Sequence, residues 1–518
     1  MLSRLEQVAL IQEVREDVAT SDASLYVIGN ASFSVVAPQA TFDLQTFERQ
    51  IKRDTLTPLR GLTGMKMGMI KFSLEMAGNT TTDATVFPEF DLPLRACGFR
   101  REKLLRIPGA FTTGTLLRHG DVVTQTGGGA GGATATVVSD TYTGQGELWV
   151  TQGESVANGS PTNSTFFLGS GTITVGTGAT IWTGTTASQT PAPVFTQTGA
   201  LAMTTSNDGI GYWPITQAIT NLATNASGIA VDIPDGTVLV TTVAGTKNYF
   251  IKYGTQAAVG TEHTLVAVRR IIGHTAISTA VKSTDDVTTY FTTSGVAAAR
   301  EVQYLAPTLT MGGLFDGVRE SIAGARGTVK VRCAIGEPAM LDFEFKGKKN
   351  TFQDGGLLSG VSYSQALPPV ILDADFSVAD DTMTFAAEAV PPVSIVEFDM
   401  ANTVQYRKSI DAATGLLESY IAERKPTFSV DPEALPEAFF DWLAMYSGNL
   451  NTRMRMRVGT TNGNKFLITA LGLAITASGV GDRDGIRTRQ ITGNLTSGSQ
   501  STSTVLKDNE LVIIWQLA

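Results

Sequence analysis

The side chains that most often carry out catalysis or bind metals are few in this sequence, and their spacing matches no known catalytic pattern. Its three histidines are His119, His263 and His274, and its two cysteines, Cys97 and Cys333, lie far from each other and do not form metal-binding pairs with them. The sequence contains no GxSxG, HExxH or Walker motif. A hydrolase that uses two acidic residues stays open, because such a pair can come from distant segments. We predict that the protein is not an enzyme and has no cofactor.

Two glycine-containing segments resemble binding loops only in part. In "GDRDGIRT", 481–488, Asp482 and Asp484 precede Gly485 as at the start of a calcium loop, but the third acidic ligand and the closing glutamate are absent. The glycines of "GGGAGG", 127–132, lack the Lys-Ser/Thr ending of a phosphate loop and lead into a Thr/Val-rich strand. We predict turns at both places, no metal site, and cysteines that are small buried apolar residues.

The composition favours a protein built from many short strands. The chain has 518 residues, enough for roughly three domains, with 53 glycines and only 17% charged residues. Its net charge of −9 argues against a protein whose main role is to grip phosphate backbones, but it allows DNA to pass without being bound. Charges interrupt the N-terminal segment, and no run of about eighteen apolar residues occurs. We therefore expect neither a signal peptide nor a membrane-spanning helix.

The distribution of charge divides the chain into three parts. Charged residues are frequent up to Arg106, sparse in the middle and frequent again after Arg300, and none occurs over 155–207. Valine, isoleucine, phenylalanine and tryptophan recur through this uncharged run, so we predict ordered strands there rather than disorder. The middle part is expected to be a separate unit.

The segment "KFSLEMAGNTTTDATVFPEFDLPLRACG", 71–98, predicts a strand followed by a short helix. Polar and apolar residues alternate over 71–76, which is the period of a half-buried strand. Pro93 cannot lie in the interior of a regular helix without loss of a hydrogen bond. The helix is therefore predicted to begin near Asp91, with the proline in its first turn, and to end at Gly98.

The segment "TFSVDPEALPEAFFDWLAMYSGN", 427–449, repeats this order of strand, Pro-Glu, helix and glycine. Each predicted helix is followed by an alternating basic strand and a glycine turn. After the first helix this is "TVKVRCAIGEPAMLDFEFKG", which comes only after the middle part, and after the second helix it is "RMRMRVGTTNGNKFLITALG". Both predict β-hairpins with one buried face. The predicted buried faces carry Val329, Val331, Cys333, Met454, Met456 and Val458, and the other faces carry Lys330, Arg332, Arg455 and Arg457. Two matching successions of elements indicate an internal duplication.

Four segments together resemble the tail tube proteins of long-tailed, siphovirus-like bacteriophages. They are "LPLRACGF" at 92–99, "YLAPTLTMGGLFDGVRESIAGARGTVKVRCAIGEPAMLDFEFKG" at 304–347, "AERKPTFSVDPEA" at 422–434 and "GDRDGIRT" at 481–488. Each motif alone is modest, but their order along the chain is more specific. The resemblance covers residues 1–106 and 301–518. The middle part does not match the common tube core, and it lies where such proteins often carry an extra β domain outside the tube.

This resemblance implies a mainly β fold with two tandem tube folds, each a β-sandwich or barrel with a short flanking helix, and an inserted all-β region. The first tube domain would comprise residues 1–106 and 301–350, the insert 107–300, and the second tube domain 351–518. Such subunits close into rings that stack into a conduit for genome delivery. The usual ring contains six tube folds, so two folds per chain imply a homotrimer with pseudo-sixfold symmetry. Without the duplication, six chains would be needed.

The partners that the resemblance implies are other copies of this chain, other tail proteins, and phage DNA that passes through the lumen without specific binding. It implies a place in the virion tail, synthesis in the host cytoplasm and no membrane partner. Two alternatives stay open. The protein can be a ring component of the tail tip or baseplate, or it can decorate the virion or bind the host surface through the insert. The last alternative requires an exposed aromatic patch from residues such as Trp182, Tyr212 and Trp213.

Charged residues on the polar faces of the predicted strands are the candidate functional residues. The acidic candidates for facing the lumen are Glu75, Asp342, Glu344 and Asp431. A DNA channel should hold a polyanion only weakly; alternatively, these acids pair with basic residues across strands. The basic candidates for inter-subunit or cross-strand ion pairs are Lys330, Arg332, Arg453, Arg455 and Arg457. No aromatic residues interleave with the arginines, which argues against a nucleic-acid-binding stripe.

Overall fold

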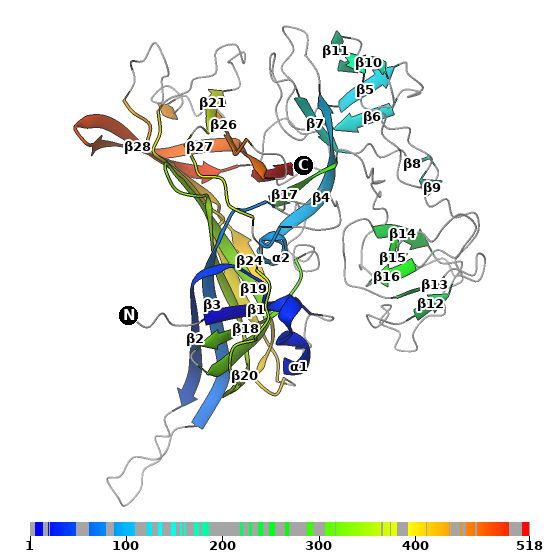
Figure 1. Cartoon of the computed structure of the whole chain (residues 1–518), viewed down its shortest axis with the longest axis vertical. Coiled ribbons are helices and arrows are strands. Elements are labelled where there is room, and N and C mark those ends of the chain that lie inside the picture. Colours follow the sequence, from blue (N-terminus) through cyan, green and yellow to red (C-terminus); the bar gives the residue numbers. More distant parts are fainter. Residues whose placement is uncertain are drawn as a thin grey trace, which may run out of the picture.

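The computed structural model describes a mainly β protein, as the composition predicted (Figure 1). The described residues are 6–47, 62–78, 88–108, 306–380, 392–434, 452–496 and 510–516, apart from short internal gaps, together with residues 436 and 446–447 and short strands between 122 and 293. Most strands belong to one sheet of 16 strands in which the neighbours are antiparallel. The predicted fold class is therefore confirmed at the level of a large antiparallel β structure.

Eight of these strands form a continuous run, which we call the eight-stranded sheet. In spatial order they are β2 (Val35–Phe47), β3 (Leu62–Glu75), β20 (Met340–Asp354), β19 (Val318–Ala334), β22 (Ile395–Asp399), β25 (Thr427–Val430), β28 (Ile486–Leu495) and β27 (Lys465–Arg483). Eight further strands join this run, either directly or through one another: β1 (Glu6–Gln12), β18 (Leu309–Phe315), β21 (Asp375–Asp380), β26 (Thr452–Val458), β29 (Leu511–Gln516), β17 (Val287–Thr293), β4 (Phe99–Pro108) and β7 (Glu147–Thr151). β17 comes from the predicted insert and nevertheless pairs with β29 and β4.

Two groups of six strands are paired in the same order, and we call them the first and the second strand set. The order is β2-β3-β20-β19-β18-β1 in the first set and β22-β25-β28-β27-β26-β21 in the second. Along the chain, the strands of each set also follow one another in the same succession. The two sets join where the C-terminal part of β19 pairs with β22.

The predicted alternation over 71–76 is confirmed. Phe72, Leu74 and Met76 are buried, whereas Lys71 and Glu75 are turned to the other face of β3. The neighbouring strands β19 and β20 alternate in register with β3. Their inward residues are Val329, Val331, Cys333, Leu341, Phe343 and Phe345, all of them buried. The inward side chains of these strands therefore form one face of a continuous core.

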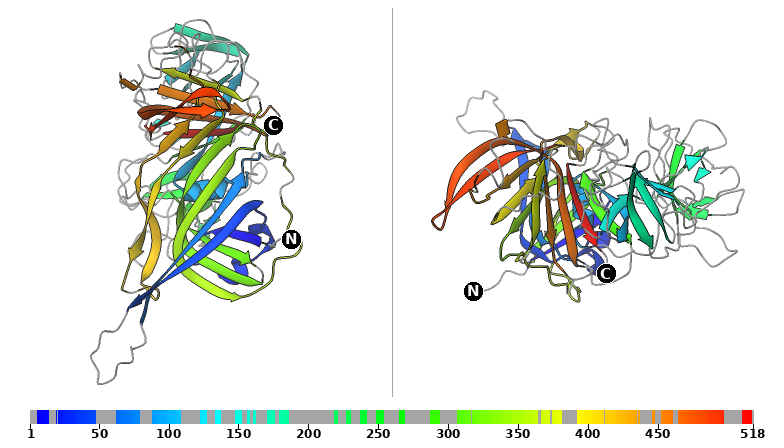
Figure 2. Two further views of the ribbon diagram at one scale, coloured as in Figure 1. Left: turned by 90° about the vertical axis from the view of Figure 1, so that its left-hand side faces the viewer. Right: turned by 90° about the horizontal axis from the view of Figure 1, so that it is seen from above.

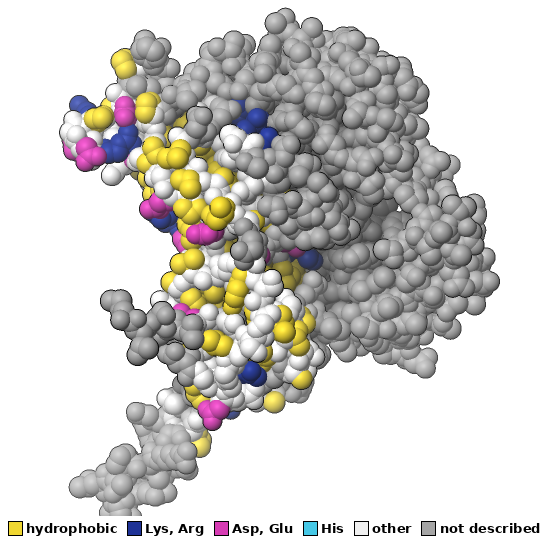
Figure 3. Space-filling view, in the orientation of Figure 1, with side chains coloured by type: hydrophobic (Ala, Val, Ile, Leu, Met, Phe, Trp, Pro, Cys, Tyr) yellow, Lys and Arg dark blue, Asp and Glu magenta, His cyan; other side chains and the backbone are white. Residues whose placement is uncertain are grey.

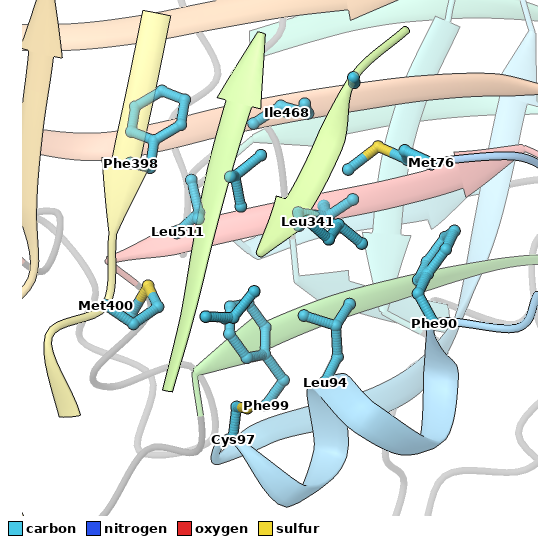
Figure 4. Packing of buried hydrophobic residues seen from close by; sticks show 14 of the residues in the cluster. Met76, Phe90, Leu94, Cys97, Phe99, Leu341, Phe398, Met400, Ile468 and Leu511 are labelled. Atoms are coloured by element: carbon cyan, nitrogen blue, oxygen red, sulfur yellow. The ribbon is translucent and has the colours of Figure 1, made fainter. Parts of the chain in front are cut away.

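The short helix is confirmed as well. α2 (Asp91–Ala96) contains Pro93 near its start, and Gly98 follows it with a φ of +88°, a conformation that favours glycine. Phe90 and Leu94 of this segment are fully buried and point into the same core as Leu341 and Leu511 (Figure 4). α2 therefore covers the inner side of the sheet. The predicted helix after Pro436 falls largely on residues 437–445, outside the described part of the chain, and residues 446–447 near its predicted end are helical.

A separate hairpin of β23 (Asn402–Lys408) and β24 (Leu416–Arg424) extends from the second strand set onto the first. It meets β19 at Gly324, where an added Cβ would lie only 2.9 Å from the Cα of Glu418. Arg326, 1% exposed, donates from Nε to the carbonyl of Ala306 at 2.9 Å and from a terminal nitrogen to the carbonyl of Ser419 at 2.7 Å. A buried arginine with these acceptors holds the hairpin against the first set.

Both predicted hairpins are present, as β19–β20 and β26–β27. The second hairpin differs from the prediction in one respect, because Arg453 and Arg455 are buried along with Met454 and Met456. The alternating sequence predicted one open face, but both faces of β26 are covered.

In the middle part, β5 (Val122–Thr126) and β6 (Ala133–Thr136) pair on either side of the glycines at 127–132, as expected of a hairpin. β10 (Ser170–Val175) and β11 (Ala179–Thr185) form two further ordered strands within the uncharged run. The remaining described elements are short. They are α1 (Asp22–Leu25), η1 (Ile28–Asn30), β8 (Val156–Ala157), β9 (Ser160–Pro161), β12 (Ala218–Thr220), β13 (Ser227–Ile229), β14 (Thr237–Thr241), β15 (Asn248–Tyr253) and β16 (Leu265–Val268).

The side chains of several residues singled out from the sequence lie outside the described part of the chain. They are His119, His263, His274, Trp182, Tyr212 and Trp213. The exposed aromatic patch required by the host-binding alternative therefore stays a prediction.

Candidate functional surface

The outer side chains of the eight-stranded sheet share one face, opposite the core. On the first strand set and the adjoining β22 this face is rich in charge, with acidic and basic residues on neighbouring strands (Figure 3 shows both kinds on the described surface). Its charged members are Lys71, Glu75, Lys330, Arg332, Asp342, Glu344, Lys346, Lys348, Glu397 and Asp399. We call the whole outer face of the eight-stranded sheet the polar face.

Glu344 is at the centre of one ion-pair cluster. Lys71, its partner across β3 and β20, lies 2.6 Å from it, and Lys346 lies 3.5 Å from its other oxygen. Partial burial alone would raise the pKa of Glu344, but the hydrogen bond and charge of Lys71, followed by those of Lys346, outweigh it and keep the pKa below its ordinary value. The carboxylate therefore stays ionised and neutralises two lysines.

A second cluster spans the junction of the two strand sets. Glu397 on β22 lies 3.0 Å from Lys330 and 4.0 Å from Arg332, both on β19. Arg332 also reaches Glu337 in the β19–β20 turn at 2.9 Å. Since these side chains are partly exposed, each pair contributes little to stability, about 0–1 kcal/mol. Their main effect is to neutralise the cations of β19.

The acidic residues predicted as one group occupy different environments. Asp342 accepts a hydrogen bond from the hydroxyl of Ser73 on β3. Glu75 is exposed at the end of β3. Asp431 accepts hydrogen bonds from the backbone N–H groups of Ser394 and Ile395, at 2.9 and 2.8 Å. Asp431 therefore fixes the chain at the start of β22, whereas Asp342 and Glu75 remain on the polar face.

Asp431 also belongs to an ion-pair group at the end of the β27–β28 hairpin. Arg483 lies 3.3 Å from Asp431 and 2.7 Å from Glu433. The hairpin turn itself consists of Asp484 and Gly485, both with positive φ, and Asp482 accepts a hydrogen bond from the N–H of Gly485 at 3.1 Å. The segment predicted as a turn is thus a tight two-residue hairpin.

On the second strand set the charges of the polar face are confined to β22 and to the Asp431–Arg483 pair near the β27–β28 turn. Between them, the outer residues of β25, β28 and β27 include Thr427, Ser429, Gln490, Thr492, Asn494, Ala477 and Gly479, all uncharged. The arginines of β26 are not on this face, because β26 lies outside the eight-stranded sheet. The basic candidates Arg453, Arg455 and Arg457 are therefore separated from Lys330 and Arg332, and only the latter two lie on the polar face.

The β23–β24 hairpin covers one end of the polar face. The hydroxyl of Tyr406 donates to the carbonyl of Gly68 at 3.4 Å. Burial, followed by the negative charges of Asp43 and Glu344, raises the pKa of Tyr406 to about 12, so this phenol is neutral at physiological pH. The end of the face that lies toward the β19–β22 junction is the part available to a ligand or partner.

Sequence reasoning missed the partners of these charges. Lys71 was in the predicted strand but was not singled out, and Glu397 lies in the alternating segment "IVEFD", which the same period-two pattern would have marked. Which acid meets which base depends on the register between strands far apart in the chain, such as β19 and β22. No local pattern contains that register.

The described residues offer no group of three or more histidine, cysteine, aspartate or glutamate side chains placed to hold a metal ion. Both cysteines, Cys97 and Cys333, are buried and free, as predicted.

The polar face presents paired charges and hydroxyl groups, an arrangement suited to contact with a polar partner. Within the described ranges, helices are too short or too polar to cross a membrane.

A comparison with models of protein families found no match, and a comparison with curated proteins found none either.

Proposed function

We propose that this protein forms rings that stack into the tail tube of a long-tailed bacteriophage, through which the genome passes to the host. In this proposal each chain contributes two tube folds, and three chains close one ring. The observation that carries it is the repeated strand order, with two six-stranded sets that share one continuous sheet. A chain that already contains two equivalent units side by side is suited to a ring that continues the same repeat.

The repeat supports a duplication, although with a different match of strands from the one that the hairpin sequences indicated. The basic strands had matched β19–β20 with β26–β27. The strand order matches β18–β19 with β26–β27, and β20 with β28. The pair β3 and β25 keeps the match seen in the sequence, because "FSLE" and "FSVD" lie at equivalent places in the two sets.

The ends of the eight-stranded sheet support ring closure. β2 pairs with β3 along one edge, and the C-terminal part of β27 pairs with β28 along one edge. Exposed strand edges promote uncontrolled pairing, and closure into a ring removes them. A ring would therefore satisfy both ends of the sheet at once.

The polar face supports a role as the wall of a DNA conduit. A cation that is free to contact phosphate releases counterions and adds to the affinity for DNA. On the first strand set Lys71, Lys330, Lys346 and Arg332 each lie within 4.0 Å of a carboxylate oxygen. On β28 of the second strand set, Gln490, Thr492 and Asn494 present amide and hydroxyl groups on this face. Both arrangements reduce the attraction for a passing polyanion.

Electron microscopy of the purified chain under conditions that favour virion assembly tests this proposal. We expect rings and stacked tubes with a central channel. Single rings that never stack would favour a component of the tail tip or baseplate. Persistent monomers would count against any ring-forming function.

A further inference from the structure

The junction between β19 and β22 provides a template for contacts between chains. Residues 330–334 of β19 pair antiparallel with the whole of β22, and Cys333 lies opposite Val396. Both side chains are only 2% exposed. The junction thus combines a short backbone ladder with a buried apolar pair at its centre.

The register identifies the equivalent residues of the second strand set. "FSLE" of β3 and "FSVD" of β25 align Leu74 with Val430. From these residues the ladders can be followed across β20 and β28 to β19 and β27. In the first set Leu74 lies opposite Leu341, which lies opposite Val331. In the second set Val430 lies opposite Ile491, which lies opposite Ser478. Ser478 is therefore the equivalent of Val331, and Val480, two residues further, is the equivalent of Cys333.

Val480 lacks the cover that its equivalent has. Its side chain is 58% exposed, whereas Cys333 is 2% exposed, beside β22 and facing the main core. Over 474–483, β27 pairs with β28 and with no other described strand. The β27–β28 hairpin also extends away from the rest of the described molecule (Figure 2). The second strand set thus has an open edge where the first is closed by β22.

The matching open edge lies at the other end of the sheet. Val35 of β2 pairs with Leu74 as Val396 of β22 pairs with Val430, so Val35 is the equivalent of Val396. Among the described strands, β2 is paired only with β3, and the neighbouring Val36 is 43% exposed. The edge of β22 that pairs with β19 therefore has an equivalent edge on β2, and this edge of β2 is open.

We propose that residues 477–481 of one chain pair antiparallel with residues 34–38 of the next, with Val480 opposite Val35. The contact repeats the β19–β22 junction between chains and rests on the proposed ring-forming function. It is heterologous, because one chain contributes β27 and its neighbour contributes β2, and such contacts close into rings when the rotation permits. Pro38 has no backbone donor, which weakens the ladder at that position and confines close pairing to residues 34–36.

A disulfide test addresses this register in the full chain. In Val35→Cys/Val480→Cys the two positions of one chain are on opposite edges of the sheet, roughly 30 Å apart at the usual strand spacing. A disulfide between them can therefore form only between chains. Burial raises the pKa of Cys333 to about 12 and that of Cys97 well above its usual value, so the native thiols stay protonated and give no background.

The matched control is Phe47→Cys/Val480→Cys. Phe47 is exposed on the same strand, twelve residues further along and about 40 Å from Val35. Under mild oxidation we expect Val35→Cys/Val480→Cys to form a closed covalent ring, at least tenfold more than the control. Rings that assemble but form no more disulfide than the control would overturn the junction and leave the ring-forming function intact. Absence of rings in the unmodified protein would overturn both.

Val480→Asp provides a second measurement that does not depend on thiols. Because the side chain is mostly exposed in the single chain, we expect the unfolding midpoint to stay the same. A charge buried opposite Val35 should reduce the ring population at least tenfold. Rings at the level of the unmodified protein would contradict a contact through Val480.

Discussion

The first and the second strand set share one order of strands but differ in the chemistry of their polar faces. In the first set, lysines and an arginine are paired with carboxylates, within the set as in Lys71–Glu344 or across the junction with β22 as in Lys330–Glu397. In the second, threonine, serine, glutamine and asparagine side chains occupy the corresponding strands. The inward residues of both sets pack into one core. The strand order therefore depends on the core positions, whereas the outer face can change from paired charges to hydroxyl groups.

The two sets also differ in how the start of the first strand in their spatial order, β2 or β22, is fixed. The backbone N–H of Ser34, just before β2, donates to Glu89 at 2.9 Å. The equivalent N–H groups before β22 donate to Asp431. A carboxylate thus serves both places, but it comes from a loop before α2 in the first set and from the end of β25 in the second. Glu75, the equivalent of Asp431 in the sequence pattern, remains exposed.

The contact between the two sets is expected to show the largest effect. Replacing Arg326 by alanine removes two hydrogen bonds from a buried guanidinium and leaves the carbonyls of Ala306 and Ser419 without this donor. We expect the free energy of unfolding to fall by about 4 kcal/mol, measured by denaturant titration. Lys425→Ala, directly after the same hairpin and with a 74% exposed side chain whose partner Glu423 is also exposed, is the control and should cost about 1 kcal/mol or less. Equal losses for the two variants would show that Arg326 does not hold the sets together.

A buried acid in the first set should make stability depend on pH. Burial raises the pKa of Glu13 to about 7, against the opposing hydrogen bonds from Gly324, Thr308 and Thr310 and the charge of Lys348. The folded chain therefore binds this proton more tightly than the unfolded chain. The resulting stabilisation is complete below pH 4.5 and is lost as the pH rises through about 7, a change on the order of 3 kcal/mol.

Glu13→Gln should remove this pH dependence. We expect the difference in unfolding free energy between Glu13→Gln and the unmodified protein to change steadily between pH 4.5 and 8, in favour of the glutamine variant at high pH. A difference that stays constant across this range would contradict the proposed titration of Glu13.

The difference between Asp431 and Glu75 can be measured directly. Asp431→Ala leaves the N–H groups of Ser394 and Ile395 without their acceptor, and we expect a loss of about 2 kcal/mol in unfolding free energy. Glu75→Ala should stay within about 0.5 kcal/mol, as usual for exposed positions. Similar values for both would mean that the two sets fix these strands in the same way.

The smallest effect on stability is expected on the polar face. Glu397→Gln releases Lys330 from its carboxylate, whereas Arg332 keeps its pair with Glu337, and we expect a loss below about 1 kcal/mol. DNA binding should respond more strongly, because each freed cation adds a phosphate contact and steepens the salt dependence of the affinity. Retention of double-stranded DNA by assembled tubes, compared with a Thr492→Ala control, measures this. Equal retention would argue that the ion pairs of the first set do not limit contact with phosphate.

Local features of the fold could be predicted from the sequence, whereas the pairing of distant strands could not. The strand at 71–76 and the helix that begins at Asp91 follow from the spacing of apolar residues and from Pro93 and Gly98. The Asp-Gly turn at 484–485 is likewise a local signal. These elements each depend on residues that are close in the chain.

The candidate site was harder to predict because it depends on contacts between distant segments. The burial of Arg453 and Arg455 requires a second covered face on β26, which an alternating pattern cannot indicate. The pairing of Lys330 with Glu397 requires the register of β19 against β22. Asp431 looked equivalent to Glu75 in its sequence, but its hydrogen bonds come from the chain before β22.

The mass of a single isolated ring tests the central claim that each chain supplies two equivalent tube folds. We expect native mass spectrometry to give three chains, since three chains provide the six folds of the usual ring. A ring of six chains would contradict the claim, because each chain would then count as one fold in spite of its repeated strand order.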